Sequence, residues 1–330
     1  MSVCKRGFRN LRITFTLLAL SALTMAQEPS PQKQSDPLVK LSLIVMDRSK
    51  HSVDDLKKEE ILILEDKVPQ TVSLLTKDDR PIVYAVAIDN SGSFKKVLGP
   101  ALDAVRMLIN SKKDEDEVAL IRFISSDKIE TVQNFIPDKS TLIDSLKLLR
   151  IEGGQSAVND AIYLAVKAAA DYKASDSIRR AVVLVSDGEE RNSYYNTDAL
   201  VELLRAKNVQ VFVIGIVNEL DNENSFIRQS PRQAAEELLN RVASESGGRV
   251  FFPKSADDLL RVTAEIIDDL HSQYIVGYQS TTTDKKNFRK VEVKIPSTPG
   301  REKLIAITKS GYFVNPPNLE GKGKDKKKSK

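Results

Sequence analysis

Short apolar, β-branched runs alternate with longer segments of helical periodicity through the middle of the chain, from Pro81 to His271. Unbroken apolar runs are typical of strands buried on both faces of a sheet, and helices place apolar residues three and four positions apart. The pattern predicts strands at 83–88, 118–124, 129–135, 181–185, 209–217 and 249–252, and helices at 95–110, 141–149, 158–172, 197–207, 232–246 and 256–271. This alternation favours an α/β fold, in which a doubly wound, mostly parallel sheet carries helices on both faces.

The pattern changes on either side of this α/β segment. Strand-like runs without intervening helices precede it at 38–46, 60–66 and 71–75, and follow it at 273–279, 289–295 and 303–308. The simplest arrangement is that the β segments at 27–80 and 272–315 pack together as one small module, with the domain at 81–271 inserted between them. Residues 316–330 form a lysine-rich tail that we expect to be disordered.

The first 26 residues differ in composition from the rest of the chain. Residues 13–25 are mostly apolar, Ala26 is a small residue suited to cleavage, and the basic start comprises Lys5, Arg6, Arg9 and Arg12. This pattern predicts a secretory signal peptide at 1–26 and an extracytoplasmic protein, either periplasmic or secreted. A membrane anchor is the alternative, but the apolar run is short for a span. Cleavage would remove Cys4, the only cysteine, so no disulfide is expected.

The net charge of the chain resides mainly at its ends. The formal charge is +4, which equals the four basic residues of the first 26, so the cleaved chain is near neutral. The last ten residues hold six lysines and one aspartate, so the body carries about −5. This balance does not indicate a nucleic-acid partner. The only histidines are His51 and His271, which argues against a zinc site built on histidine and against a histidine-based triad.

Oxygen-bearing side chains directly follow the strand predicted at 83–88. Asp89, Ser91 and Ser93 form an Asp-x-Ser-x-Ser sequence, and Gly92 loosens the turn between the two serines. Hard oxygen ligands of this kind suit Mg²⁺, or Mn²⁺ as a substitute. In an open parallel sheet, ligands bind beyond the carboxyl ends of the strands, which is where this loop is expected.

Two further loops offer ligands of the same type. Ser156 follows a pair of glycines before a predicted helix, and Asp187 follows the strand at 181–185. If the sheet is doubly wound, the three loops converge at one edge and surround one cation, with waters completing its shell. The predicted metal ligands are Asp89, Ser91, Ser93, Ser156 and Asp187. Each loop also has a plain structural interpretation, such as helix capping by the serines or a simple Ser-Asp-Gly turn.

At these residues the chain resembles the von Willebrand factor A (VWFA) domain family, over roughly 81–271. The metal-ion-dependent adhesion site (MIDAS) of that family has Asp-x-Ser-x-Ser in its first loop, threonine in its second and aspartate in its third. Asp89, Ser91, Ser93 and Asp187 match this motif, whereas Ser156 stands where threonine is usual and keeps only the hydroxyl. The flanking β segments look like a bacterial subgroup of the family found in acidobacteria. The resemblance implies a Rossmann-like domain beside a small β module.

The resemblance also implies a protein-binding or adhesion module outside the cytoplasm rather than an enzyme. A Mg²⁺ ion held by two carboxylates and neutral hydroxyls keeps an open position, which the Asp or Glu carboxylate of a protein partner can fill. One alternative is a metal-dependent hydrolase with Glu189 or Glu190 as general base, although both are expected to be surface residues. The other is a structural envelope protein with a vestigial site. No membrane span is expected after cleavage of the signal peptide.

Overall fold

The computed structural model describes residues 38–220, 229–282, 286–298 and 300–319. The predicted signal peptide at 1–26 with Cys4, the segment that joins it to Leu38, and the last lysine-rich residues lie outside the described residues. No helix within the described ranges combines the length and the apolar character needed to cross a bilayer.

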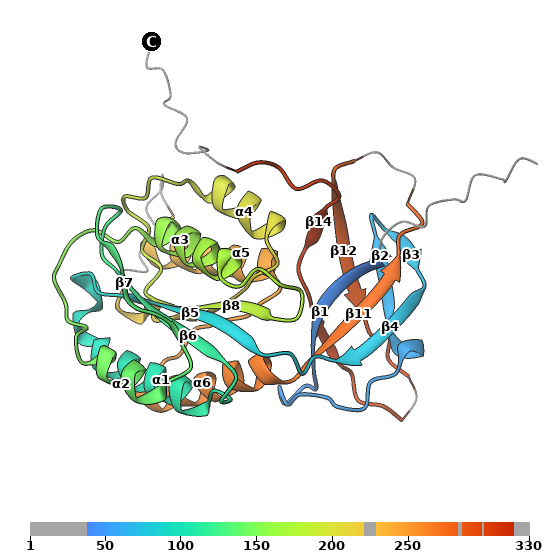
Figure 1. The fold of residues 1–330 in the computed structure, drawn as a ribbon, viewed down its shortest axis with the longest axis horizontal. Coiled ribbons are helices and arrows are strands. Elements are labelled where there is room, and N and C mark those ends of the chain that lie inside the picture. The colour runs from blue at the N-terminus through green and yellow to red at the C-terminus, as the bar shows by residue number, and fades with distance from the viewer. Residues whose placement is uncertain (1–37, 221–228, 283–285, 299, 320–330) are drawn as a thin grey trace, which may run out of the picture. The chain divides into compact units, whose positions relative to one another are not determined.

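A six-stranded sheet lies at the centre of the α/β part (Figure 1). In spatial order its strands are β10 (Val250–Phe251), β9 (Gln210–Gly215), β8 (Arg179–Ser186), β5 (Ile82–Asp89), β6 (Glu117–Phe123) and β7 (Ile129–Ile136). Neighbouring strands are parallel, except that β7 runs antiparallel to β6. Every residue of β5 is buried, which explains its unbroken apolar run. The predicted doubly wound, mostly parallel α/β fold is confirmed.

Helices cover both faces of this sheet (Figure 1). One face carries α1 (Leu98–Ser111), α2 (Lys139–Leu146) and α6 (Ala256–His271), and the other carries α3 (Val158–Asp171), α4 (Thr197–Ala206) and α5 (Pro231–Ser246). Because side chains alternate along a strand, Tyr84 and Val86 pack in the first hydrophobic cluster and Ala85 and Ala87 in the second. The strands therefore bind the two helical layers into one domain.

The helix boundaries mostly follow local capping signals. Ser230 accepts a hydrogen bond from the backbone N–H of Gln233 at the start of α5, which ends at Gly247 with φ of 78°. The helix predicted at 95–110 begins later, at Leu98, because Ser93–Lys96 form a separate 3₁₀ turn. Ser93 therefore lies in the segment between β5 and α1, outside the α-helix.

Strands from both sides of the α/β part pair with each other in two four-stranded antiparallel sheets. One sheet contains β13 (Ile305–Ile307), β1 (Leu38–Met46), β11 (Gln273–Gln279) and β4 (Val72–Lys77). The other contains β14 (Gly311–Phe313), β12 (Phe288–Lys294), β2 (Leu62–Glu65) and β3 (Val68–Gln70). Leu43, Ile63 and Tyr278 belong to the buried cluster that these strands share. We refer to the strands β1–β4 and β11–β14 as the β module.

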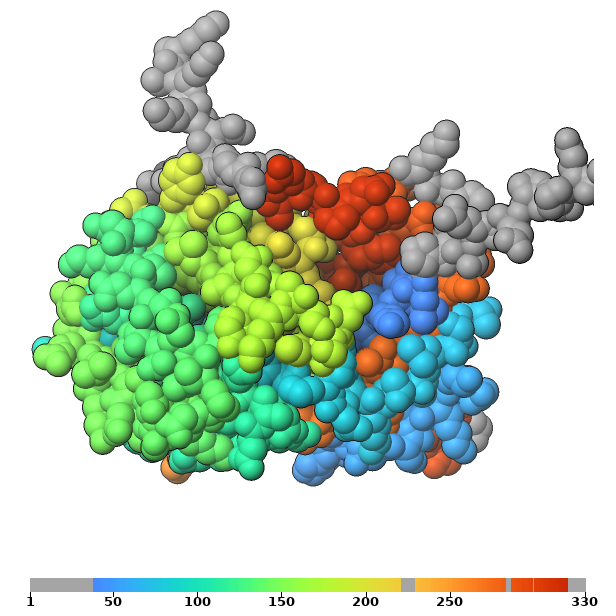
Figure 2. Space-filling model, in the orientation of Figure 1, coloured from blue at the N-terminus to red at the C-terminus, as the bar shows by residue number. Residues whose placement is uncertain are grey.

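The last described residues lie against the α/β part (red in Figure 2). Pro316, Pro317 and Leu319 line a hollow together with Tyr163 of α3 and Leu203 of α4. Leu319 also packs at the border of the second hydrophobic cluster of the α/β part. These residues belong to the tail that the sequence places at 316–330, and they contact α3 and α4 without forming a helix or strand.

Candidate metal site

Three loops meet at the carboxyl ends of the central parallel strands. Asp89 is the last residue of β5, and Asp187 directly follows β8. Ser156 lies in the loop that leads into α3. β5 and β8 are hydrogen-bonded parallel neighbours, with Ile88 opposite Val185, so the residues that follow them emerge side by side. The topology thus brings segments nearly a hundred residues apart to one edge of the sheet.

One hydrogen-bond network connects the five predicted ligands. The Ser156 hydroxyl donates to Asp89 Oδ2 over 3.5 Å, and the backbone N–H of Ser91 donates to Asp89 Oδ1 over 2.9 Å. The hydroxyls of Ser91 and Ser93 lie 3.1 Å apart. Ser93 in turn donates to Asp187 Oδ2 over 2.6 Å. The structure therefore brings all five side chains together in one place.

Both carboxylates of this network are buried, with Asp89 0% exposed and Asp187 3% exposed. Among the ion pairs of the described residues, none involves either carboxylate, and the neighbouring Arg191 pairs with Glu189 instead. Burial, and then the negative charge of Asp187, raise the pKa of Asp89 to about 6. Burial also raises the pKa of Asp187. The two groups therefore form a negative site without a direct ion-pair partner among the described residues.

The donor set fits a small, hard divalent cation. It consists of two carboxylates and three hydroxyls, which are the oxygen ligands that Mg²⁺ prefers. A backbone N–H fixes one oxygen of each carboxylate, from Ser91 to Asp89 Oδ1 and from Glu189 to Asp187 Oδ1 at 3.0 Å. The Oδ2 atoms of both residues then face the serine hydroxyls. These residues could hold a cation in place of the hydroxyl protons that the serines now direct at the two carboxylates.

Two glycines allow the second and third loops to approach the core. Gly154 has φ of 123°, and a Cβ there would lie 2.5 Å from Ile124 Cγ2. Gly188 has φ of 74°, and a Cβ there would lie 2.7 Å from Leu239 Cδ1. Other residues rarely adopt such φ values, and neither position has room for a side chain. Both loops therefore require a glycine within two residues of the side chain that they present.

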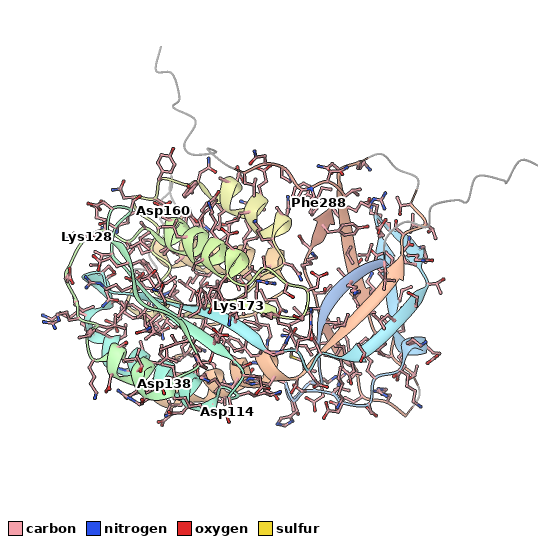
Figure 3. All side chains as sticks on the ribbon, viewed as in Figure 1. Asp114, Lys128, Asp138, Asp160, Lys173 and Phe288 are labelled. Carbon is pink, nitrogen blue, oxygen red and sulfur yellow. The ribbon has the colours of Figure 1, made fainter. Side chains whose placement is uncertain are left out.

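Sequence reasoning missed Ser186 and Asp160, which hold the loops in position. Ser186 is fully buried, donates to Asp89 Oδ2 over 2.7 Å and accepts from the backbone N–H of Gly188 at 3.0 Å. Asp160 (Figure 3) accepts hydrogen bonds from the backbone N–H groups of Tyr194 and Tyr195, both at 2.7 Å. The sequence signals that could have identified them are the hydroxyl of Ser186 directly before Asp187 and the carboxylate of Asp160 in the first turn of a predicted helix.

Glu190, expected at the surface, is half-buried and also has a structural role in the third loop. Its carboxylate accepts hydrogen bonds from the backbone N–H of Asn159 at 2.8 Å and of Ser193 at 2.9 Å. The hydroxyl of Ser193 also donates to it, over 2.7 Å. Glu189 is half-buried as well and pairs with Arg191. Both acids thus shape the third loop, and neither carboxylate is free of partners.

The family model described as von Willebrand factor type A domain matches residues 85–265. This match covers more than half of the chain, and it ends within α6. The chain therefore belongs to the von Willebrand factor type A domain family. Domains of this class typically support metal-dependent adhesion and protein interaction.

Several solved structures resemble this chain. An aerotolerance-related membrane protein from Bacteroides fragilis NCTC 9343 is 20% identical, with a TM-score of 0.44 over 57% of this chain and 98% of that chain. The SpRpn10 VWA domain is 17% identical, with a TM-score of 0.43 over 55% of this chain and 95% of that one. Proximal thread matrix protein 1 from the mussel byssus, with a zinc-occupied MIDAS motif, is 15% identical, with a TM-score of 0.47 over 64% of this chain and 50% of that one.

Proposed function

We propose that this chain is an extracytoplasmic, metal-dependent protein-binding module that recognises an acidic side chain of its partner. The ion would be Mg²⁺, or Mn²⁺ as a substitute, and the ligands would be Asp89, Ser91, Ser93, Ser156 and Asp187. A bound divalent ion supplies an electrophilic position that a partner's Asp or Glu carboxylate can fill. In this proposal the chain binds and performs no catalysis. The resemblance of its flanking segments to those of the acidobacterial subgroup supports membership of that subgroup.

The observation that carries this proposal is the pair of buried carboxylates, neither of which has a direct ion-pair partner among the described residues. Asp89 and Asp187 are joined through Ser93 and the hydroxyl of Ser91, and both have a raised pKa. Buried charges are strongly unfavourable unless a partner compensates them. A divalent cation balances two carboxylates without excess negative charge, so a third carboxylate from outside can still be attracted.

An exposed aromatic side chain next to the third loop supports recognition of a protein partner. Tyr194 is 52% exposed and lies edge-on to Tyr195, which stacks on Tyr163 with ring centroids 3.6 Å apart. Asp160 fixes the backbone of both loop tyrosines. Rigidly held tyrosines are frequent anchors of protein interfaces. The ion would then bind the carboxylate of the partner, and the side chains around the ion would determine which partner is selected.

The extracytoplasmic location rests on the start of the sequence. Its basic residues, apolar stretch and Ala26 support export through a signal peptide. A chain released at Gln27 would contain no cysteine and would fold without disulfides.

Hydrolase activity is the second candidate, and the local contacts make it less favourable. A general base must be able to reach a substrate or a metal-bound water. Glu190 is occupied by three hydrogen bonds from Asn159 and Ser193. His271 lies 3.1 Å from Asp116 Oδ2, just before β6 begins, at the opposite end of the strands. Divalent-dependent hydrolysis that disappears in Glu190→Ala would favour the enzyme over the binding module.

Calorimetric titration of the mature chain with Mg²⁺ and Mn²⁺ tests the proposal. The wild-type protein is expected to show saturable binding at one site, and Asp89→Ala is expected to show none. Asp103→Ala is a matched control, because Asp103 is an exposed acid on α1 that pairs with Arg106. Far-UV circular dichroism would establish that all three proteins are folded.

Partner capture with and without a chelator completes the test. Binding that requires Mg²⁺, disappears in Asp89→Ala and weakens in Tyr194→Ala would support the module. Tyr194→Ala should bind Mg²⁺ normally, because its side chain is not among the proposed ligands. No divalent binding by the wild-type protein would favour a structural envelope protein with a vestigial site, and chelator-resistant capture by Asp89→Ala would contradict the proposed mechanism.

A further inference from the structure

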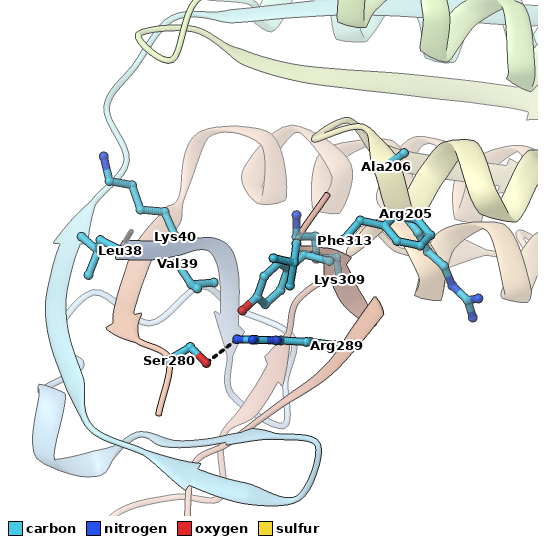
Figure 4. A pocket seen from close by; sticks show the side chains of 11 residues that line it. Leu38, Val39, Lys40, Arg205, Ala206, Ser280, Arg289, Lys309 and Phe313 are labelled. Atoms are coloured by element: carbon cyan, nitrogen blue, oxygen red, sulfur yellow. Dashed lines mark hydrogen bonds between the residues drawn. The ribbon is translucent and has the colours of Figure 1, made fainter. Parts of the chain in front are cut away.

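A separate cavity of about 340 Å³ lies where the end of α4 meets the β module (Figure 4). Its lining includes four basic side chains, from Lys40, Arg205, Arg289 and Lys309, and no acidic side chain. Cavities that bind small molecules start at about 300 Å³ and combine apolar walls with a few polar groups. The cavity shares no residue with the three loops of the candidate metal site.

Two of the four basic residues form ion pairs with acidic residues that do not line the cavity. Arg205 pairs with Glu245 at 2.7 Å, and Arg289 pairs with the buried Glu65 at 3.1 Å. Within the described parts of the chain, the ammonium groups of Lys40 and Lys309 have no hydrogen-bond or ion-pair partner. The cavity therefore carries an excess of positive charge.

Lys309 is the unusual member of this group, because it is half-buried. Burial lowers the pKa of its ammonium group. Its backbone cannot move easily, since Thr308 donates to the carbonyl of Ser42 over 2.8 Å and the carbonyl of Ser310 accepts from the backbone N–H of Val291 at 3.0 Å. A partly desolvated ammonium without a counter-ion is unfavourable, and an anion placed in the cavity would compensate its charge.

The other polar groups of the cavity are already oriented. Arg289 donates to the hydroxyl of Ser280 over 2.5 Å (dashed in Figure 4), and Glu65 accepts from both residues. The guanidinium of Arg205 stacks over the ring of Phe288, labelled in Figure 3, at 4.6 Å from its centroid. Fixed cationic groups can receive an anion without losing further side-chain freedom.

The rim of the cavity is apolar and partly exposed. Leu38 is 37% exposed and Val314 is 45% exposed, and Phe313 lines the cavity beside Val314. A ligand that contacted this rim would bury these side chains and gain hydrophobic stabilisation. A cationic interior with an apolar rim matches a ligand that has an anionic head and an apolar body.

We propose that this cavity binds a small organic anion, a carboxylate or a phosphate attached to an apolar body. Lys309 and Arg289 contact the anionic head, and Leu38, Phe313 and Val314 contact the body. Binding at this site is independent of the metal site.

Titration of the full mature chain with hexanoate, hexyl phosphate and the neutral hexanol tests this inference in the presence of a chelator. At least one of the two anions is expected to bind saturably and about tenfold or more tighter than hexanol. The preferred anion identifies the head group as carboxylate or phosphate. Asp89→Ala is expected to bind the same anion unchanged, which separates this site from the metal site. Absence of saturable binding, or equal affinity for hexanol, would overturn the inference.

Lys309→Met tests the assigned role of the buried ammonium. The variant keeps the length of the side chain and is expected to lose affinity for the anion by about tenfold or more. Lys147→Met, which changes an exposed lysine at the end of α2, is the matched control and should bind normally. Because it removes a half-buried charge without a counter-ion, Lys309→Met without ligand should melt no lower than wild type. Anion affinity within about twofold of wild type in Lys309→Met would overturn the assignment.

Discussion

The hydroxyl of Ser186 donates a 2.7 Å hydrogen bond to Oδ2 of Asp89, so the last residues of two parallel neighbouring strands are joined at the candidate metal site. The hydroxyl of Ser156 donates to the same oxygen over 3.5 Å. These hydroxyls provide only partial positive charge, and the pKa of Asp89 stays raised to about 6. Without a cation, the folded protein therefore holds a carboxylate that resists ionisation.

In a chelator, the free energy of unfolding is expected to fall as the pH rises from about 4 to about 6. The pKa of Asp89 is raised on folding, so in this window the folded protein binds more protons than the unfolded chain, whose aspartates titrate near 4. Stability must then decrease with pH over that range. Asp89→Asn should flatten this part of the curve in urea denaturation, whereas Asp103→Asn should not.

Saturating Mg²⁺ is expected to reverse this trend, because a cation binds the ionised carboxylates and stabilises only the folded protein. The free energy of unfolding should then increase from pH 4 to pH 6, as metal binding strengthens. An unchanged slope in Asp89→Asn, with or without Mg²⁺, would contradict the assignment of this pH dependence to Asp89.

Substitutions of Ser156 should separate the contribution of its hydroxyl to metal binding from the contribution of its backbone carbonyl to the loop. The Ser156 carbonyl accepts a hydrogen bond from the backbone N–H of Arg191 at 3.0 Å, which any residue can provide. Ser156→Ala should therefore keep the loop but weaken Mg²⁺ binding by about tenfold or more, or ~1.4 kcal/mol. Ser156→Thr, which keeps the hydroxyl, should bind Mg²⁺ nearly as well as wild type. Equal affinities for the two variants in calorimetry would exclude this hydroxyl as a ligand.

Gly188→Ala and Gly153→Ala should differ in stability although both glycines have positive φ values. A Cβ at Gly188 would lie 2.7 Å from Leu239 Cδ1, whereas a Cβ at Gly153 has no atom within 4 Å. Gly153→Ala should cost only the backbone strain of about 1–2 kcal/mol, and Gly188→Ala should cost about 2–5 kcal/mol because overpacking is added. Thermal denaturation measures both, and similar losses would show that Leu239 yields without cost.

Glu65→Gln should destabilise the β module. Tyr278, Tyr312, Ser280 and Arg289 all donate hydrogen bonds to this fully buried carboxylate. Removing the charge breaks the buried ion pair between Glu65 and Arg289, which typically costs about 3–5 kcal/mol, so we expect a loss of that size. Urea denaturation would measure it, with Glu292→Gln as the control, because Glu292 is exposed on the same strand as Arg289.

The same carboxylate should make the protein sensitive to acid. Burial acts to raise the pKa of Glu65, but hydrogen bonds from Ser280 and Tyr278 outweigh this effect, and the pKa is lowered. Its contribution to stability is thus present above the pKa of an unfolded glutamate and is lost as the pH falls through the lower, folded value. Wild type and Glu65→Gln should therefore converge in stability at low pH, and a constant difference would contradict this explanation.

The fold of the α/β part and the meeting of its three loops could be predicted because they depend on local signals. The buried run of β5 identifies a strand, and Asp89 is placed at its carboxyl end by the sequence itself. Ser156 precedes a helix and Asp187 follows a strand. The sequence pattern predicts both of these elements equally clearly. Parallel topology then brings the three loops to one edge of the sheet.

The supporting contacts could not be predicted, because they join segments distant in the sequence. Ser186 reaches Asp89 across the sheet, and Glu190 caps the backbone of α3 from the third loop. The three-residue strands β3 and β14 are too short to have a pattern of their own. The burial of Lys309 likewise arises from packing, since a lysine in a polar connection carries no signal of burial.

The two connections between the α/β part and the β module have a mechanical consequence. The chain enters β5 at Ile82, and α6 ends at His271, which contacts Asp116 just before β6. Both connections therefore lie at the amino ends of the central strands, whereas the candidate metal site lies at their carboxyl ends. A partner pulling on the site against an anchored β module would load β5 and β8 lengthwise. Their backbone hydrogen bonds would then resist in shear, all at once, so the fold is suited to transmitting tension.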